Sequence, residues 1–595
     1  EIASCLVGSE MCIRDRSYTI YHDLPVITRN AFIINCGQQS LRLNQMMSMS
    51  LDLPDQDYEM IELCGSWSRE RSIKTRKLVE GIQSIYSLRG CSSHQFNPFI
   101  ALKRKNCNEC TGEVLGFSFV YSGNFLAQVE VDNYHISRVL MGIHPHGFEY
   151  VLNHLDSFQT PEVVMVYSNQ GLNKMSQTYH KLYQTRLVRG KYRDQVRPIL
   201  VNNWEGTYFD FNEDKIVKMA QTAKDLGIEL FVLDDGWFGH RDDDTTSLGD
   251  WFENSRKLPK GLKGLAEDVN ALGMQFGLWF EPEMVNEDSD LYREHPDWAI
   301  QIPGRKPVKG RNQLLLDFSR KEVVDAVYEQ MCQVLDQGNI EYVKWDMNRS
   351  MAEVYSMTAE EQGSVQYDYM LGLYDFLERI ISRYPDLLIE GCSGGGGRFD
   401  AGMLYYTPQI WCSDNTDAVD RVRIQYGTSF GYPVSAVGSH VSAVPNHQTG
   451  RKTSLHTRGV CAMAGTFGYE LDPAKMTDEE RREIREQIVE YKKYAQLVQN
   501  GLYYRLSNPF AEEIGAWEFV SEDGKEVLVN VVMLEIHGNM TVNYVKMKGL
   551  CAGQFYKDSN TGKIYPAEAL MEVGIPMPLE FGEYKAYQIY LEMVE

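Results

Sequence analysis

The chain has 595 residues, of which 43% are hydrophobic and 24% charged, and this composition is typical of globular proteins rather than of disordered or fibrous ones. A formal net charge of −23 disfavours nucleic acid and acidic membranes as partners, because phosphate groups repel a polyanion. No apolar run reaches the roughly 18 residues that a membrane-spanning helix needs.

The 12 cysteines are too sparse for a disulfide scaffold in a chain of this length. Several of them lie in predicted strands, so free thiols in a reducing, cytoplasmic compartment are the simpler interpretation. Cys107 and Cys110 form one CxxC pair, but a zinc site of this kind needs a second pair at suitable spacing. We therefore predict neither a metal nor a cofactor.

The first 16 residues, EIASCLVGSEMCIRDR, lack the basic region, the long apolar region and the cleavage site of a signal peptide. They resemble translated adapter sequence, and we interpret them as a non-native leader outside the fold. Residues 17–190 are predicted to form a first, mostly β domain, because alternating runs separated by Gly, Asn and Pro are typical of antiparallel strands. These runs are Tyr18–Tyr21, Val114–Tyr121, Phe125–Val131 and Val163–Tyr167. Leu172–Arg189 has apolar residues at helical spacing and is expected to lead into the next domain.

Residues 191–505 show a different pattern, in which short apolar runs alternate with helical stretches that end at glycine. The predicted helices include Asp214–Leu226, Gly261–Leu272, Glu322–Asp336 and Tyr367–Arg383. The predicted strands are Ile199–Asn203, Glu229–Leu233, Met274–Phe280, Gln313–Leu316, Ile340–Arg349, Leu387–Ile389 and Gln409–Cys412, with the last near Val434–Val437 or Gly459–Met463. Eight such units in about 300 residues favour a (β/α)8 barrel over a doubly wound sheet, and no GxGxxG dinucleotide motif is present.

Residues 506–595 are predicted to form a small antiparallel β domain. A charged amphipathic helix over Asp478–Gln499 precedes it, with Thr477 and Glu480 as its capping box. The predicted strands beyond that helix are Ala516–Phe519, Val527–Met533, Met540–Val545 and Tyr584–Leu591.

Acidic residues gather where the predicted barrel strands end, which is where such barrels carry their chemistry. The residues at these ends are Trp204, Asp234, Asp235, Glu281, Glu283, Asp317, Asp346, Glu390 and Asp414. Two carboxylates that face each other across a pocket without metal ligands suit the hydrolysis of a glycosidic bond.

Asp346 and Asp414 are the best candidates for that pair, and we place them on the fifth and seventh barrel strands. Lys344 shares a strand face with Asp346 and would keep it ionised as a nucleophile, although the two could also form a structural ion pair. Asp414 lies close to Trp411, where partial burial would raise its pKa and suit a general acid. Its alternative role is a helix N-cap, since Ser413–Asp417 is rich in capping residues.

Other candidates would bind a sugar. Asp234 and Asp235 could accept hydrogen bonds from hydroxyls, or form only a turn before a glycine. Arg311 could donate to a hydroxyl or to a site carboxylate, or be a solvated loop charge. Trp204 offers a flat face for a sugar ring, although a lone tryptophan is more often part of a core. The glycines around Gly395 would let the backbone approach a ligand or form a flexible turn.

Six motifs occur in an order that resembles the bacterial α-galactosidases of glycoside hydrolase family 36. They are LDDGWF (Leu233–Phe238), GLWFEPEMV (Gly277–Val285), KWDMNR (Lys344–Arg349), EGCSGGGGRFD (Glu390–Asp400), SDNTDAVDR (Ser413–Arg421) and SHVSAVPNHQTGR (Ser439–Arg451). The resemblance runs from about Ser17 to the C-terminus. It implies a (β/α)8 TIM barrel flanked by an N-terminal β-supersandwich and a C-terminal antiparallel β-sandwich.

The resemblance also implies retaining hydrolysis of terminal α-D-galactosyl residues, as in melibiose and raffinose-type sugars. By motif position Asp346 is the nucleophile and Asp414 the acid/base. The positions that match sugar contacts in the family are Trp204, Asp234, Asp235, Arg311, Lys344, Cys392, Gly395 and Trp411. The implied partner is an α-galactoside substrate, with no nucleic acid and no membrane.

Three alternatives stay open at this point. On the same frame the protein could be an α-N-acetylgalactosaminidase or a galactosyl transferase of the raffinose-synthase type. It could also be a non-catalytic galactoside-binding protein. Family members have a longer N-terminal region, which in tetramers lends residues to a neighbour's site, so we expect a chain shortened at that end, with a homo-oligomer as one alternative.

Overall fold

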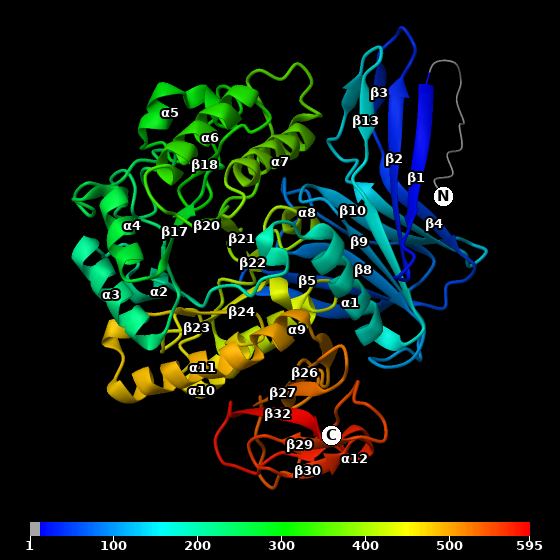
Figure 1. Cartoon of the computed structure of the whole chain (residues 1–595). Helices are drawn as coiled ribbons and strands as arrows, with labels where there is room; N and C mark the ends of the chain where they lie inside the picture. Colours follow the sequence, from blue (N-terminus) through cyan, green and yellow to red (C-terminus); the bar gives the residue numbers. More distant parts are fainter. Residues whose placement is uncertain (1–11, 595) are drawn as a thin grey trace.

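The computed structural model describes residues 12–594, which form an N-terminal β part, a central barrel and a C-terminal β part. In Figure 1 the N-terminal strands lie to the right of the barrel and the C-terminal strands lie below it. No helix in these residues is long and apolar enough to cross a membrane. Residues 1–11 of the predicted leader lie outside the described residues.

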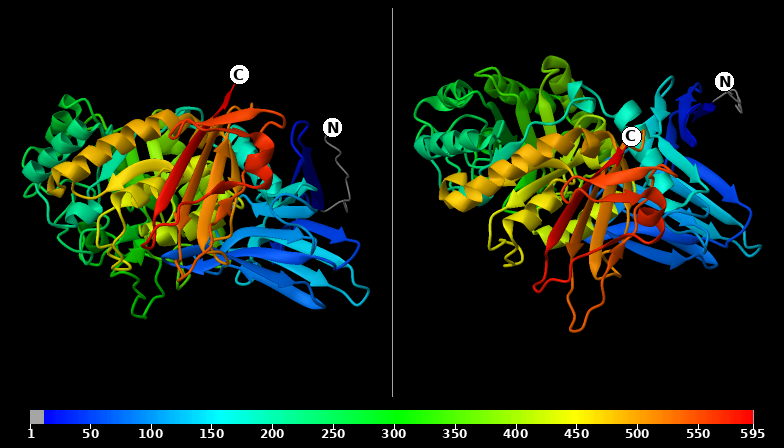
Figure 2. Two further views of the ribbon diagram at one scale, coloured as in Figure 1. Left: turned by 90° about the horizontal axis from the view of Figure 1, so that it is seen from below. Right: turned by 60° about the horizontal axis from the view of Figure 1, so that its bottom comes forward.

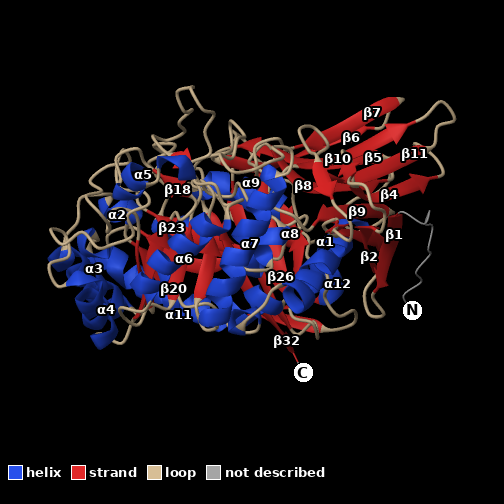
Figure 3. Cartoon of the chain, turned by 90° about the horizontal axis from the view of Figure 1, so that it is seen from above, coloured by secondary structure: helices blue, strands red, loops and turns tan. Residues whose placement is uncertain are grey.

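The N-terminal part consists of antiparallel strands in two main sheets, whose strands lie at the right of Figure 3. One sheet has the order β1-β2-β14-β9-β8-β5-β6, with β13 also paired to β2, and the other has the order β4-β11-β10-β7. The strands are β1 (Cys12–Ile20), β2 (Val26–Asn35), β3 (Leu41–Leu43), β4 (Met47–Leu53), β5 (Glu59–Ser66), β6 (Arg69–Lys77), β7 (Gly81–Tyr86), β8 (Phe96–Lys103), β9 (Val114–Phe119), β10 (Phe125–Val131), β11 (Ser137–Ile143), β12 (Tyr150–Leu152), β13 (Ser157–Gln159) and β14 (Val163–Ser168).

Two features at the edges of this part differ from the expected bounds. β1 begins at Cys12 and pairs with β2 along its whole length, so its first five residues belong to the segment that we had placed outside the fold. At the other end, α1 (Gly171–Leu182) continues into one π-helical turn over Tyr183–Leu187. Its Asn173 and Gln177 side chains donate to carbonyls near the start of the C-terminal sheet, so α1 joins all three parts.

The barrel is closed and parallel, with the strand order β15-β16-β17-β20-β21-β22-β23-β24. These strands are β15 (Leu200–Asn202), β16 (Leu230–Leu233), β17 (Gln275–Phe280), β20 (Tyr342–Trp345), β21 (Leu388–Gly391), β22 (Gln409–Trp411), β23 (Val437–Ser442) and β24 (Thr466–Glu470). The main helices of the outer layer are α3 (Glu213–Leu226), α4 (Gly261–Ala271), α6 (Lys321–Leu335), α7 (Val365–Arg383), α8 (Ala401–Leu404), α9 (Ala418–Thr428), α10 (Leu455–Ala462) and α11 (Asp478–Asn500). Short helices in the loops are α2 (Trp204–Thr207) and α5 (Asp290–Glu294).

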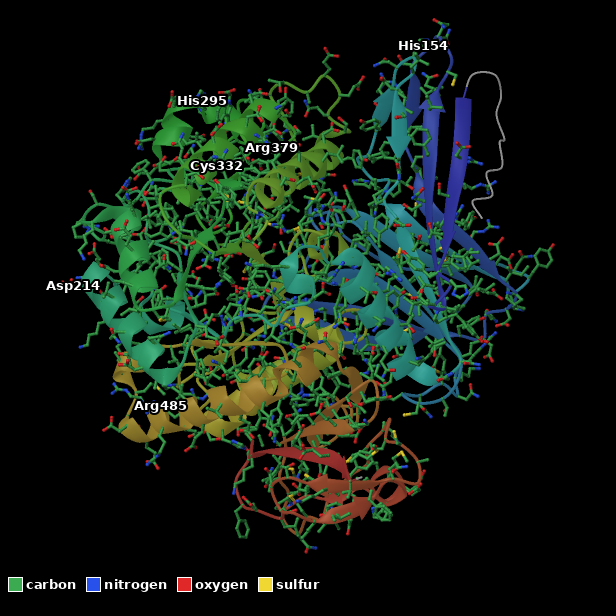
Figure 4. The ribbon with its side chains drawn as sticks, viewed as in Figure 1. His154, Asp214, His295, Cys332, Arg379 and Arg485 are labelled. Carbon is green, nitrogen blue, oxygen red and sulfur yellow. The ribbon has the colours of Figure 1, made fainter. Side chains whose placement is uncertain are left out.

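The helical layer follows the apolar pattern of the sequence. α3 buries Ile216, Ala220 and Ala223 and ends at Gly227, whose φ of 96° is the left-handed stop that glycine favours. The capping box predicted for α11 is present, with Thr477 and Glu480 bonded reciprocally. Figure 4 shows that the side chains of Asp214 and Arg485 lie on the outer surface of α3 and α11.

Two predictions about the barrel were wrong. Gln313–Leu316 is no barrel strand: β19 (Leu314–Leu315) pairs antiparallel with β18 (Met284–Val285) in a loop ribbon. A four-residue apolar run cannot distinguish the two cases. The seventh and eighth strands are β23 and β24, while Gly459–Met463 lies mainly in α10. Asp346 therefore follows the fourth barrel strand and Asp414 the sixth.

The C-terminal part is an antiparallel sheet with the order β25-β26-β27-β32-β29-β30, beside a two-stranded ribbon of β28 and β31. Figure 2 shows it packed against α11 and the barrel's outer layer. Its elements are β25 (Leu502–Arg505), β26 (Ile514–Val520), β27 (Glu526–Met533), β28 (Tyr544–Val545), β29 (Phe555–Asp558), β30 (Ile564–Pro566), α12 (Ala567–Glu572), β31 (Ile575–Pro576) and β32 (Ala586–Val594). β25 precedes the boundary expected after residue 505, and the domain boundaries stay predictions.

Candidate active site

A cavity of about 640 Å³ opens at the carboxyl ends of the barrel strands. Eight of the ten site residues expected from the sequence line it: Trp204, Asp234, Asp235, Arg311, Lys344, Asp346, Trp411 and Asp414. The other two, Cys392 and Gly395, are not part of its lining but adjoin the two candidate catalytic aspartates. The barrel thus brings together residues that are separated by more than 200 positions in the sequence.

Asp346 follows β20 and is buried, with four hydrogen bonds to its carboxylate. Met347 N and Gly394 N donate to Oδ1 at 2.8 and 3.1 Å, and the Asn348 amide and the Trp279 indole donate to Oδ2 at 2.7 and 3.3 Å. Burial alone would raise the pKa of Asp346, but the charges of Lys344 and Arg311 and the hydrogen bond from Asn348 outweigh burial and lower that pKa. The carboxylate is therefore held in one orientation and kept ionised, as a nucleophile requires.

Lys344 forms its ion pair with Asp234, not with Asp346. Its Nζ lies 2.9 Å from Asp234 Oδ2, and both side chains are buried. The Asn202 amide donates to the same Asp234 oxygen at 2.6 Å. Burial would lower the pKa of Lys344, yet the charges of Asp234 and Glu470 raise it well above its usual range. Lys344 thus acts on Asp346 through space while it holds Asp234.

Asp234 and Asp235 form a tight turn and also face the cavity. Asp235 N donates to Asp234 Oδ1, and Gly236 follows with a φ of 109°. Asp235 is paired with buried Arg241 through two bonds of 2.5 and 2.8 Å. Burial nevertheless raises the pKa of Asp235, because Arg241 offsets the desolvation only in part. Both sequence interpretations, turn and polar ligand site, thus fit the same two residues.

Arg311 lies on a strained loop at the cavity wall. It has a φ of 50° and the next residue a φ of 61°, in the left-handed region that side chains other than glycine rarely adopt. Burial lowers the pKa of Arg311, but the charges of Glu281, Asp346 and Asp414 raise it above the ordinary value. Its guanidinium is therefore a cation placed among the site carboxylates.

The tryptophans divide between wall and core. Trp204 and Trp411 line the cavity, and the Arg421 guanidinium lies 4.5 Å from the Trp411 ring centre. Trp237 is fully buried, and its indole donates to the Trp279 carbonyl at 2.9 Å. Trp237 is therefore a core residue.

A glycine turn after β21 separates the two aspartates. Gly394 donates to Asp346, while a Cβ at Gly395 would lie 2.5 Å from Asp414 N. Gly395 has a φ of 78°, so only glycine fits this approach without strain. Its role in this structure is to admit the loop of Asp414. The Cys392 thiol lies close to Asp346, and burial, followed by the charge of Asp346, raises the pKa of Cys392 well above its usual range.

Asp414 follows β22 in the loop of residues 413–417, which we call the acid loop. The cap of α9 is Asp417, which accepts from Val419 N and Asp420 N, so Asp414 is not the N-cap. Burial and the nearby charge of Asp346 raise the pKa of Asp414. The pKa of Asp414 is therefore raised and that of Asp346 lowered, as a general acid and a nucleophile respectively need.

The ten site residues expected from the sequence do not include Trp67, which lines the cavity, or Glu281, which lies close to Asp346 without lining the cavity. The Trp67 indole, from the N-terminal part, donates to Asp414 Oδ2 at 2.9 Å. Glu281, noted only as a ring member, accepts from Gln313 and from Asn348 N, and burial followed by the charge of Asp346 raises its pKa to about 8. No local pattern marks Trp67, because its partner is 347 residues away.

Three other ring carboxylates are structural. Asp317 is buried in the loop after β19 and Glu390 points into the barrel, where the Gln409 amide donates to it at 2.8 Å. Glu283 pairs with Arg398 at 2.7 Å, and both are buried. Tyr369 and Trp345 also donate to Glu283. Within residues 12–594, no group of three or more His, Cys, Asp or Glu side chains could hold a metal ion.

Replacing Arg398 by methionine should destabilise the barrel by about 3–5 kcal/mol, because it leaves the buried Glu283 charge without its cation. The measurement is the midpoint of thermal unfolding. Arg379→Met is the matched control, since the Arg379–Asp325 pair is partly exposed and should contribute about 1 kcal/mol or less. Figure 4 shows Arg379 on α7, in the outer layer near Cys332 of α6. Equal midpoints for the two variants would contradict the structural role of Glu283.

Three family descriptions match the chain: Melibiase over residues 157–501, and the N-terminal and C-terminal domains of glycosyl hydrolase family 36 over residues 14–153 and 514–591. The chain is 55% identical to α-galactosidase AgaA of Geobacillus stearothermophilus, over 100% of this chain and 81% of AgaA. It is 54% identical to the bifunctional α-galactosidase/sucrose kinase AgaSK of Mediterraneibacter gnavus, over 96% of this chain and 60% of AgaSK.

Solved structures agree with this likeness. The crystal structure of AgaA superimposes with a TM-score of 0.97 at 55% identity, covering 98% of this chain and 81% of that one. A variant of AgaA has been solved in complex with raffinose, again with a TM-score of 0.97. The α-galactosidase of Lactobacillus brevis also matches with a TM-score of 0.97, at 45% identity and over 98% of this chain and 80% of that one. The predicted fold class is thereby confirmed, and the chain belongs to glycoside hydrolase family 36.

Proposed function

We propose that this protein is a retaining α-galactosidase that hydrolyses terminal non-reducing α-D-galactosyl residues of melibiose and raffinose-type sugars. The observation that supports it most is one cavity with two aspartates of opposite character: Asp346 has a lowered pKa and Asp414 a raised one. Paired carboxyl groups of this kind hydrolyse glycosides with retention when one attacks and the other exchanges the proton. The relatives AgaA and AgaSK have α-galactosidase in their names.

In the first step Asp346 attacks the anomeric carbon of the bound galactosyl unit. Asp414 enters protonated and gives its proton to the glycosidic oxygen, which leaves with the rest of the substrate. Asp346 is ready for attack because it is ionised and fixed by four donors, so no reorganisation is needed when the bond forms. A β-galactosyl ester of Asp346 results.

In the second step water replaces the aglycone. Asp414, now ionised, takes a proton from that water, whose oxygen attacks the anomeric carbon and releases Asp346. The product is α-galactose, and Asp414 has regained its proton. Two inversions at one carbon give overall retention.

The remaining cavity residues would recognise the galactosyl unit. Asp234 and Asp235 are buried carboxylates that already have cationic partners, so their remaining lone pairs can accept sugar hydroxyls in charge-assisted hydrogen bonds. Trp204 and Trp411 would cover the apolar faces of the ring. Arg311 would donate to a hydroxyl near the reacting carbon.

Two further proposals concern the setting of the enzyme. Free thiols at Cys392 and Cys412, both buried beside the site, are compatible with a reducing, cytoplasmic compartment. A homo-oligomer also stays a proposal, which the mass measured in solution would decide.

The experiment that tests the function is hydrolysis of melibiose beside raffinose, with the released galactose followed by NMR. We expect both sugars to be cleaved and α-galactose to appear before mutarotation produces the β anomer. If β-galactose appeared first, the retaining mechanism would be refuted.

The same assay separates the alternatives. Faster cleavage of an aryl N-acetyl-α-galactosaminide than of the α-galactoside would indicate an α-N-acetylgalactosaminidase. Galactosylated acceptor in place of free galactose, at high acceptor concentration, would indicate a transferase. Binding of galactose without turnover would indicate a non-catalytic protein.

A further inference from the structure

The N-terminal part reaches the catalytic site through the hairpin of β5 and β6. Figure 1 shows β5 on the barrel side of the N-terminal part. The hairpin tip, residues 66–69, is tightly turned: a Cβ at Gly65 would lie 2.1 Å from the Arg69 carbonyl, and Ser68 has a φ of 65°. Only glycine fits at position 65, because any Cβ there would collide with the Arg69 carbonyl.

Arg71 anchors this hairpin in the barrel. Its guanidinium is buried and donates to Thr428 Oγ1 at 2.7 Å, to the Gly396 carbonyl at 2.9 Å and to the Cys412 carbonyl. The barrel leaves room for it, because a Cβ at Gly427 would lie 1.8 Å from the Arg71 carbonyl. The hairpin therefore occupies a fitted place beside the glycine turn and the acid loop.

The same hairpin holds the acid loop at three points. Ser413 Oγ donates to Glu70 at 2.5 Å, and the Asn415 amide donates to the Ser68 carbonyl at 3.1 Å. Between these two contacts, the Trp67 indole donates to Asp414 Oδ2 at 2.9 Å. The bond to the acid/base is thus one of a set that ties the whole loop to the hairpin.

The chemistry of an indole restricts what this bond can be. An indole N–H only donates, so the Asp414 oxygen that faces it can only accept. In a protonated carboxyl group the carbonyl oxygen accepts a hydrogen bond more strongly than the hydroxyl oxygen does. The bond from Trp67 therefore favours the form of the acid with its hydrogen on Oδ1.

We propose that Trp67 is a positioning residue for the acid/base: it occupies Asp414 Oδ2, so that Asp414 exchanges its proton through Oδ1 alone. This inference rests on the proposed function. In the first step Oδ1 gives its proton to the glycosidic oxygen, and in the second it takes one from water, while Trp67 stays bonded to Oδ2. Because the bond favours the ionised form, it also limits how far burial raises the pKa of Asp414.

The test is Trp67→Phe, which keeps an aromatic ring and removes the N–H. Loss of that donor should raise the pKa of Asp414 further and move the alkaline limb of kcat/KM for melibiose upward by about one pH unit. The acid limb, set by Asp346, should not move. Hydrolysis of melibiose at the optimum should fall about tenfold because the carboxyl loses its fixed orientation.

The charged and titratable groups that also face Asp414 are unchanged in this variant: Asp346, Lys344, Glu70, Arg311, Cys392 and His447. A shift therefore reports the change at Trp67 itself. Trp517→Phe is the matched control, because the buried indole of Trp517 has no hydrogen-bond partner among the described residues and lies in the C-terminal sheet. It should leave the pH profile unchanged.

Carbon-13 NMR of aspartate-labelled protein gives a second measurement that needs no turnover. The Asp414 carboxyl signal, assigned with Asp414→Asn, should titrate at higher pH in Trp67→Phe than in the wild type. An unchanged titration, or a lower rate with an unmoved alkaline limb, would overturn the proposal. If the wild type released no galactose, the proposed function would fail, and the NMR titration would still decide the role of Trp67.

Discussion

Asp346→Ala should lower the release of nitrophenol from an aryl α-galactoside by about four orders of magnitude or more, because the variant has no group to form the galactosyl ester. The carboxylate is held by two backbone N–H groups and two side chains, none of which could replace it as a nucleophile. The measurement is steady-state kinetics at the pH optimum of the wild type.

Azide tests the stereochemistry of the same variant. The anion can enter the space of the missing carboxylate and attack the face opposite the aglycone, so the product should be β-galactosyl azide. A product with the α configuration would show that Asp346 is not the nucleophile. Asp214→Ala is the control for a lost aspartate, since Asp214 lies on the exposed surface of α3 and should leave the rate unchanged.

Asp414→Ala should lower the rate of hydrolysis by a factor that depends on the leaving group. Melibiose needs a proton on its departing oxygen, so its cleavage should fall by about 10²–10⁴-fold. A dinitrophenyl α-galactoside leaves without that proton, and its first step should be nearly as fast as in the wild type. The galactosyl ester should then accumulate as a burst, because no base activates water. Stopped-flow absorbance at the nitrophenolate band measures both phases.

Azide again distinguishes the roles, with the opposite stereochemical result. It needs no base and attacks the ester on Asp346, so Asp414→Ala should give α-galactosyl azide and faster turnover. The alkaline limb of the pH profile should disappear with the group that causes it. Equal losses for the two leaving groups, or a β-configured azide, would exclude Asp414 as the acid/base.

Local pattern predicted much of this fold correctly because strand and helix periods are local properties. The sequence predicted helix α3 and the capping box of α11 near their observed positions. It also predicted seven of the eight barrel strands near their observed positions, and one of these seven was the first of two alternatives. The errors occur where an apolar run is too short to show the periodicity of a strand or a helix. Leu314–Leu315 has the composition of a strand but pairs with β18 outside the barrel, and β24 was not recognised.

The candidate site was predictable to the extent that it follows the ends of barrel strands. Parallel strands in a closed barrel end on one face, so acidic residues placed after them converge there whatever their separation in sequence. That rule selected Asp346 and Asp414, which line the cavity, but it also selected Asp317 and Glu283, which do not. The position of a carboxylate at a strand end does not tell whether it faces the cavity or forms an ion pair with a buried partner such as Arg398.

The sequence by itself determined the alternation of strands and helices, the barrel and the acidic residues at its open end, because each depends on neighbours a few positions apart. Only the tertiary structure decided that Lys344 pairs with Asp234, that Gly395 admits the acid loop, and that Trp67 bonds to Asp414. These contacts join segments up to 347 residues apart, and a charge or donor takes its partner from whichever side chain the packed fold places next to it.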